Sequence, residues 1–436
     1  MDLLIGIPTT TKMKFFASIV ALLLSAAVAA DAQCLAEDDN VQHSKADNPL
    51  ARTRLYKGES IFTLKLLEAI NAATPSENVF FSPYSLYHVL LLMYFGAKSD
   101  TEQTLRKGLE LHWTEDKPVV WQAYNVGKKA LAMRFGQNKA DEIQFVSVDK
   151  LFFGKQIPVE ECMEDKFFEE IEKLDFEKDP ESQRLYINNW VENTTHGEIT
   201  DLLIPGSITK NTKLAIANAA YFKGTWQSKF KPEETKKEIF YVSNERQEFV
   251  DMMHVEGTFN HAANEKLGCH ILELPYTGQD EASRVSMFVF LPPTESNALD
   301  KLLARLTSSP DILSEVVNEG ISRRVDVKLP KFSIEKTVDM KTVLGRLGMG
   351  KLFENSADFS GFSKKTQIGF DEVLQKSKIT VNEEGATAAS ATVAFSFRSS
   401  RPADPAMFHC NHPFIFVIYD YATQAVLFNG VYRQPE

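Results

Sequence analysis

The stretch "SPYSLYHVLLLMYFGAKS", residues 82–99, is apolar on nearly every side of the helix that it predicts. Ser82 followed by Pro83 is typical of a helix start, because serine caps free backbone N–H groups and proline suits the first helical position. The helix has no polar stripe to present to water, so it must be buried on all sides. Such a helix requires a large core, which the rest of the chain has to supply.

The segments around this helix are predicted to be helices early in the chain and strands late in it. Residues 58–73 and 185–199 carry helical patterns, and the second ends at a glycine. Val325, Val327 and Leu329 alternate with polar residues, which predicts a strand with one buried face. Further strands are predicted at 214–222, 269–276, 284–293 and, as a hairpin, at 413–432. With no repeat and no long linker, the chain predicts a single α+β domain.

Composition excludes some partners. The chain has 436 residues, is 44% hydrophobic and carries a net charge of -11, so it can bury a large core. An acidic chain argues against nucleic acid as an obligatory partner, because phosphate binding needs a basic face. Lys128–Lys129 and Arg323–Arg324 are the densest basic pairs, and solvated faces explain them. No dense basic helix argues for activation by a glycosaminoglycan.

The first residues read as a targeting segment. Lys12 and Lys14 precede an apolar run at 15–30, and small residues at 30–32 form an A-x-A cleavage pattern. The run is shorter than the ~20 residues of a membrane span, so a cleaved signal peptide is the better interpretation. We therefore expect a signal peptide at 1–32, an N-terminal extension at 33–56 and a folded domain at 57–436, in a secreted protein without a membrane segment. Met13 is an alternative start to Met1.

Cysteines and enzyme motifs give little support to catalysis. Four scattered cysteines do not make a disulfide framework, and their pairing stays open: Cys34, Cys162, Cys269 and Cys410. Cys410 is expected to open a strand and pack as a small hydrophobic residue. The chain has no G-x-S-x-G, H-E-x-x-H, P-loop or G-x-G-x-x-G motif. We expect no enzyme, no cofactor and no metal; a secreted hydrolase is the distant alternative.

The segment "EEGATAASAT", residues 383–392, contains nothing bulky after its two glutamates. A flexible linker would favour glycine and serine with charges, and a helix would need an apolar stripe. Small side chains throughout suggest a segment that must enter a tight place.

Several stretches together resemble the serpins, the serine protease inhibitors of the suicide-substrate type. They are "NVFFSPYSLYHVLLLMYFGAKSDTEQTL" at 78–105, "NAAYFKGTW" at 218–226, "VDVKLPKFSI" with "LGMGKLFENSADFSG" within 325–361, "NEEGATAASAT" at 382–392, and "CNHPFIFVIYD" with "VLFNGVY" within 410–432. The resemblance is collinear from about Lys57 to the end. It implies a serpin fold, with helices around three β-sheets and an exposed reactive-centre loop at about 385–408.

The resemblance also implies a role for the small-residue segment. In inhibitory serpins a protease attacks the loop, forms an acyl-enzyme, and is trapped when the loop inserts as a new central strand. The implied hinge comprises Glu384, Gly385, Ala386, Thr387, Ala388, Ala389, Ser390, Ala391 and Thr392. Alternate residues of an inserted strand face the interior, and none from Gly385 onward is charged, so burial carries no penalty for an unpaired ion. Non-inhibitory serpins tend to have bulky, charged or proline residues here, so a carrier or chaperone is the alternative.

Other matching positions are expected to control opening of the sheet. Ser82, Ser85 and Asn218 match polar positions under the central strands, and Trp226 matches the tryptophan where insertion begins. Ser82 could equally be only a helix cap, and Trp226 only core. Gln375 stands where many serpins carry histidine, which implies a hydrogen-bonded gate without a titrating member.

The scissile bond is ambiguous. The family's usual count from the hinge glycine falls on Ser399–Ser400, whereas Arg398–Ser399 suits a trypsin-like pocket, whose buried acid favours a cation. Arg401 is a weaker candidate because proline follows it, and Phe395 or Phe397 would suit a chymotrypsin-like pocket. We expect Arg398–Ser399, and hence covalent capture of an extracellular trypsin-like serine protease by a monomeric inhibitor.

Asn193 begins the sequon Asn193-Thr194-Thr195, and export would make it a glycosylation site. We predict that Asn193→Gln lowers the apparent mass of protein recovered from the medium of secreting cells. Glycosidase treatment should produce the same shift in the wild type. Equal gel mobility of the untreated wild type and variant would contradict the prediction.

Overall fold

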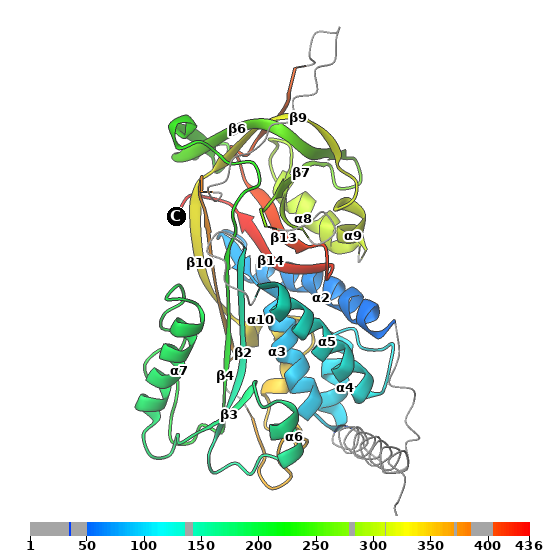
Figure 1. Ribbon diagram of the computed structural model, residues 1–436, viewed down its shortest axis with the longest axis vertical. Coiled ribbons are helices and arrows are strands. Elements are labelled where there is room, and N and C mark those ends of the chain that lie inside the picture. The colour runs from blue at the N-terminus through cyan, green and yellow to red at the C-terminus, as the bar shows by residue number, and fades with distance from the viewer. Residues whose placement is uncertain are drawn as a thin grey trace, which may run out of the picture.

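A computed structural model describes Leu35 and residues 50–135, 143–278, 284–309, 311–369, 373–384 and 404–436. The expected signal peptide, most of the expected hinge and every candidate scissile bond lie outside these residues. Within them, helices and two hydrogen-bonded sheets form an α+β architecture (Figure 1). No helix among the described residues is long and apolar enough to cross a membrane.

Most of the helices lie in the first half of the chain, before residue 200, as the sequence predicts. They are α2 (Ala51–Ala73), α3 (Pro83–Gly96), α4 (Ser99–Gly108), α5 (Lys117–Phe135), α6 (Glu161–Lys166), α7 (Pro180–Thr194), α8 (Ala298–Ser308), α9 (Ile312–Val316) and α10 (Met340–Arg346). The helix expected at 58–73 begins earlier, because Ala51 and Leu55 also pack into the core. The helix expected to run to Gly197 ends at Thr194, and Gly197 lies beyond it with a positive φ of 81°.

Helix α3 is buried along its whole length, as its apolar sequence requires. Ser82 caps it, since its side chain accepts a hydrogen bond from the backbone N–H of Ser85. The helix packs against strands of both sheets and against α2, α4 and α5. Figure 1 shows α7 on the opposite side of the five-stranded sheet from α3, α4 and α5. Two different layers therefore cover the two faces of that sheet.

The five-stranded sheet has the order β10-β11-β4-β2-β3. Its strands are β10 (Phe332–Asp339), β11 (Leu374–Val381), β4 (Leu214–Lys223), β2 (Gln144–Gly154) and β3 (Ile171–Leu174). Strands β10 and β11 are antiparallel, and so are β4 and β2, whereas β11 and β4 are parallel. The centre of the sheet is thus a parallel pair between two antiparallel ones.

The remaining strands form a nine-stranded sheet of order β1-β14-β13-β8-β7-β6-β9-β12, with β5 also paired to β6. They are β1 (Val79–Phe81), β5 (Lys236–Tyr241), β6 (Gln247–Asn264), β7 (Cys269–Pro275), β8 (Val285–Leu291), β9 (Ile321–Pro330), β12 (Ala406–His409), β13 (Phe414–Asp420) and β14 (Ala425–Tyr432). The expected hairpin is the antiparallel pair β13–β14.

The described residues form two hydrogen-bonded sheets where three were expected, and β6 explains the difference. This 18-residue strand pairs with β9 over Met252–His261 and with β7 over His261–Asn264. A single long strand therefore joins what would otherwise be two smaller sheets.

The cysteines are in two states. Cys162 is disulfide-bonded, whereas Cys269 and Cys410 are free and buried. Burial raises the pKa of the Cys269 thiol to about 12, so the thiol stays protonated and unreactive near neutral pH. Cys410 packs in the core as expected, but it lies between β12 and β13 and does not open a strand.

Candidate functional site

The parallel pair β4–β11 is held together over a short stretch, from Gln375 opposite Asn218 to Ile379 opposite Phe222. The inner sides of both strands are buried: Gln375, Ser377 and Ile379 alternate with more exposed residues on β11. A chain entering antiparallel between β4 and β11 would replace one parallel pairing by two antiparallel ones. Antiparallel pairing is slightly more stable per residue, so the topology favours such an insertion.

One side-chain hydrogen bond bridges the two strands at the start of this pairing. Gln375 Nε2 donates to Asn218 Oδ1 at 2.7 Å, and both side chains are buried. Gln375 also accepts from the backbone N–H of Ser82 at 3.0 Å and donates to the carbonyl of Ser82 at 2.9 Å. Gln375 thus ties β11 both to β4 and to the start of α3.

Asn218 carries the connection from β4 to the helix and to β2. Its Nδ2 donates to Ser85 Oγ at 2.8 Å and to Asp149 Oδ1 at 2.7 Å, and Ser85 Oγ donates to Asp149 Oδ1 at 2.8 Å. We call Ser82, Ser85, Asp149, Asn218 and Gln375 the gate cluster. It joins three strands of the sheet to the first turn of α3.

Asp149 fixes the direction of the hydrogen bonds in the gate cluster. An ionised carboxylate only accepts, so Asn218 turns its NH₂ group toward Asp149 and its oxygen toward Gln375. Gln375 must then donate to Asn218, which leaves its oxygen for the N–H of Ser82. The backbone of Ser82 fixes Gln375 in the same orientation, because its N–H can only donate and its carbonyl can only accept, so Asp149 and Ser82 together determine the amide orientations.

Sequence reasoning missed Asp149, and it corrects the expectation that the gate has no titrating group. Burial raises the pKa of Asp149 to about 7, even though hydrogen bonds from Ser147, Ser85 and Asn218 act to lower it. The only available signal was a lone aspartate within the strand-like run "FVSVDKLFFG"; its pairing opposite Asn218 appears only in the structure. The cluster thus changes charge near neutral pH.

Ser82 is more than a helix cap and Trp226 is more than a core residue, the two local roles that the sequence left open. Ser82 caps α3 and also donates its hydroxyl to the carbonyl of Leu427 at 2.7 Å, which links the helix to β14. Trp226 is buried, stacks on Tyr276 with 4.5 Å between ring centroids, and donates Nε1–H to the carbonyl of Asn382 at 2.9 Å. Trp226 therefore holds the chain just after β11 ends.

Glu383, one residue further on, is also anchored. Its carboxylate accepts from Thr235 Oγ1 at 2.8 Å and lies 2.9 Å from Lys331 Nζ. Burial acts to raise the pKa of Glu383, but the hydrogen bonds from Lys331 and Thr235 outweigh it, and the pKa is lowered. Glu383 is therefore ionised at neutral pH, and the chain leaves the sheet at a fixed point.

The expected hinge and the candidate scissile bonds come after Glu383 in the chain. Glu384 is exposed, and its N–H donates to Asn382 Oδ1 at 3.0 Å. Residues 385–392 and the candidates Arg398, Ser399 and Ser400 lie outside the described residues. The described residues resume at 404, and the chain then forms β12, which pairs parallel with β9 of the nine-stranded sheet. The segment between them thus connects the two sheets.

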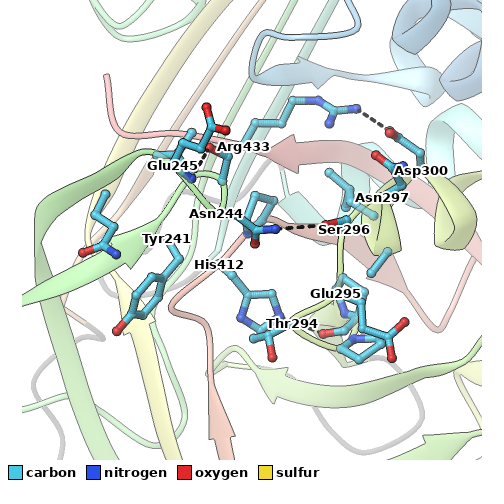
Figure 2. Close-up of a pocket in the computed structure, with 18 residues that line it drawn as sticks. Tyr241, Asn244, Glu245, Thr294, Glu295, Ser296, Asn297, Asp300, His412 and Arg433 are labelled. Atoms are coloured by element: carbon cyan, nitrogen blue, oxygen red, sulfur yellow. Dashed lines mark hydrogen bonds and ion pairs between the residues drawn. The ribbon is translucent and has the colours of Figure 1, made fainter.

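Other features of the described residues do not form a competing site. No group of three or more His, Cys, Asp or Glu side chains in the described part could hold a metal ion. A hollow of about 970 Å³ lies between the β5–β6 turn, residues 292–297 and the start of α8 (Figure 2). Two pairs of its polar side chains contact each other: Asn244 donates to Ser296 Oγ, and Arg433 lies 3.6 Å from Asp300. Asn193 is exposed on the last turn of α7.

Comparison with known proteins gives the family. Residues 57–435 match the family described as "Serpin (serine protease inhibitor)". The chain is 42% identical to serine protease inhibitor 88Ea of Drosophila melanogaster, over 88% of this chain and 92% of that protein. It is 32% identical to the leukocyte elastase inhibitor of Sus scrofa, over 88% of this chain and all of that protein. The chain belongs to the serpin family.

Solved structures agree with this assignment. Uncleaved ovalbumin matches with a TM-score of 0.75 at 26% identity, covering 87% of this chain and 100% of that one. Serpin48 of the insect Tenebrio molitor matches with a TM-score of 0.72 at 27% identity, covering 89% and 99% of the two chains.

We predict that Gln375→Ala destabilises the intact protein by about 2–4 kcal/mol, because it leaves buried groups of Asn218 and Ser82 unpaired and opens a cavity. Thermal and denaturant unfolding would measure the loss. The matched control is Gln103→Ala on the exposed side of α4, which should shift stability by less than about 0.5 kcal/mol. Equal stability of the two variants would show that the cross-strand bond does not hold the sheet closed.

Proposed function

We propose that the protein is a secreted suicide-substrate inhibitor of an extracellular trypsin-like serine protease. The observation that carries the proposal is the parallel pair β4–β11, bridged by Gln375 and Asn218, with the small-residue segment 385–392 following directly from β11. The inhibitors named among its relatives support protease inhibition in general.

The segment is long enough to become a strand of this sheet. Residues 385–398 would extend over about 46 Å at roughly 3.3 Å per residue, against about 33 Å for the ten residues of β4. Because only Asn382, Glu383 and Glu384 separate the end of β11 from the segment, the inserted chain would turn back and run antiparallel to both neighbours. The anchors at Asn382 and Glu383 define the point of that turn.

The residue types of the segment suit the inner side of the sheet. That side already carries Ser377 and Ala220 next to each other on β11 and β4. Alternate hinge residues Ala386, Ala388, Ser390 and Thr392 are all small and uncharged. They can be buried without displacing α3 and without leaving an unpaired charge.

The trapping step follows from the order of the bonds. The protease serine attacks the carbonyl carbon of the residue before the scissile bond, the peptide bond breaks, and the following residue becomes a new N-terminus. The protease is then esterified to the end of the segment that inserts. Insertion carries the ester away before water hydrolyses it, so inhibition is a competition between strand insertion and deacylation.

Arg398 favours a trypsin-like target, because a protease pocket with a buried acid binds a guanidinium. The bond Ser399–Ser400 is the alternative register. Secretion is supported by the signal-like segment 1–32 and by the disulfide at Cys162, since disulfides persist in oxidising compartments. The exposed position of Asn193 is compatible with a glycan there.

We predict that Ala388→Glu converts the inhibitor into a substrate. Insertion of the variant segment would bury a carboxylate without a partner, at a cost of several kcal/mol, and insertion would slow relative to deacylation. Glutamate adds no bond that trypsin selects, so the variant should still be cleaved at the wild-type bond but should release active enzyme, as denaturing gels and residual activity would show. Ala403→Glu, beyond the inserted part, is the control and should trap protease like the wild type. Equal complex formation by Ala388→Glu would refute insertion of this segment.

We predict that Arg398→Ala slows association with trypsin by about 30-fold or more, the usual cost of removing one partner of a desolvated charge pair. Arg401→Ala should change the rate little, and the peptide released from wild type should begin at Ser399 by mass analysis. A peptide beginning at Ser400, with Arg398→Ala still fast, would move the bond to Ser399–Ser400.

A further inference from the structure

A cavity of about 450 Å³ opens beside the gate cluster, between α5, β2 and the first turns of α3. This volume is within the range of small-molecule sites. Aromatic rings form much of its wall: Tyr84, Tyr124, Phe135, Phe145 and Trp190. Phe145 makes edge contacts with both Tyr84 and Phe135, so the wall is packed and preformed.

Asp149 lines the same cavity and has hydrogen-bonding capacity left. Its Oδ1 accepts from Ser85 and Asn218, and its Oδ2 accepts from Ser147 at 2.7 Å. A carboxylate has about four acceptor sites, so one remains on Oδ2. Among the described residues, no lysine, arginine or histidine forms an ion pair with Asp149. A partly buried carboxylate without a counterion is costly, so this position favours a cation.

The other charged groups around Asp149 do not supply that cation. Lys128 of α5 is bound to both Glu169 and Glu170, and Lys150 of β2 is bound to Glu172.

The buried side chains of His88, Tyr84 and Tyr124 in the wall carry no charge at physiological pH. Burial lowers the pKa of His88 on α3 to about 3 and raises the pKa of the Tyr84 and Tyr124 phenols well above their usual value. His196 lies exposed at the rim. Carboxylates therefore outnumber ammonium groups in the lining.

We propose that this cavity binds a small organic ammonium ion, with its charged group on Asp149 Oδ2 and its apolar body against the aromatic wall. The carboxylate supplies the ion pair, and the rings of Tyr84 and Tyr124 on the same side of the sheet attract cations. The ammonium nitrogen donates to the free acceptor site, so the three existing hydrogen bonds of Asp149 stay in place.

Binding would also act on the sheet, a consequence that rests on the proposed function. A bound cation keeps Asp149 ionised, and the ionised carboxylate accepts stronger hydrogen bonds from Asn218 and Ser85, which tie β4 to β2 and to α3. The ligand would therefore stabilise the closed sheet and slow insertion. Occupancy of the cavity would regulate inhibition from a site far along the chain from the reactive-centre loop.

Isothermal titration calorimetry of the full chain with 2-phenylethylammonium chloride tests the site without any protease. Saturable binding at one site per chain is expected, with 2-phenylethanol binding at least tenfold more weakly. The ammonium stays charged between pH 6 and 8, whereas Asp149, with its pKa of about 7, ionises over this range. Affinity should therefore rise about tenfold from pH 6 to pH 8.

Three variants separate the site from general effects. Asp149→Asn keeps the shape of the side chain but removes the charge, and should lose at least tenfold in affinity and most of the pH dependence. Ala132→Trp, on the exposed rim of the cavity, should block binding without touching the carboxylate. Asp251→Asn, on β6, is the matched control and should bind like the wild type.

The inference is overturned if the wild type shows no saturable binding, or if the alcohol binds as tightly as the ammonium. It is equally overturned if Asp149→Asn or Ala132→Trp binds like the wild type. Hydrogen exchange of the amides of β4 and β11 should slow with the probe in the wild type and not in Asp149→Asn. If the probe binds but amide exchange in β4 and β11 does not change, the binding site is supported and its effect on the gate cluster is refuted. Because no protease is present, failure here is distinct from failure of the proposed inhibition.

Discussion

The hydrogen bond from Gln375 Nε2 to Asn218 Oδ1, 2.7 Å long, is the contact on which the rest of the account depends. It joins the two strands that would have to separate, and it lies directly above the capped end of the buried helix α3. Every neighbouring polar group is arranged around it: Ser82 contacts Gln375, and Ser85 and Asp149 contact Asn218. The sheet is therefore closed by side chains at a place where backbone pairing is short.

The described structure also contains costs that an inserted strand could relieve. The hydroxyl of Ser377 is buried on the inner side of β11, and among the described residues it has no hydrogen-bond partner. An unsatisfied buried polar group of this kind costs about 1–3 kcal/mol. A chain entering between β4 and β11 would bring new backbone and side-chain groups beside Ser377. Together with the short parallel pairing, the unpaired hydroxyl is a cost that the described sheet carries and that an inserted strand could reduce.

The sequence predicted most of the local structure, because its signals are local. The all-round apolar pattern after Ser82-Pro83 predicted a buried helix, and alternation at Val325, Val327 and Leu329 predicted a strand face. Resemblance to a family supplied the gate positions, and the structure brings Ser82, Ser85, Asn218 and Gln375 into one network. Asp149 was missed because its partners are 64 and 69 residues away in the chain, and no local pattern encodes such a contact. The joining of two expected sheets was missed for a similar reason, since it depends on which strands pair along the length of β6.

The most direct test of the account is the thermal stability of the wild-type protein before and after a single cut in the segment 393–401. If the freed arm inserts between β4 and β11, the cut chain gains a central strand with antiparallel neighbours on both sides. The melting temperature of the cut protein should then lie well above that of the intact protein, and the two chain fragments should stay associated. A melting temperature that is unchanged or lower after the cut would contradict the account, because a severed loop that does not insert has no means of stabilising the fold.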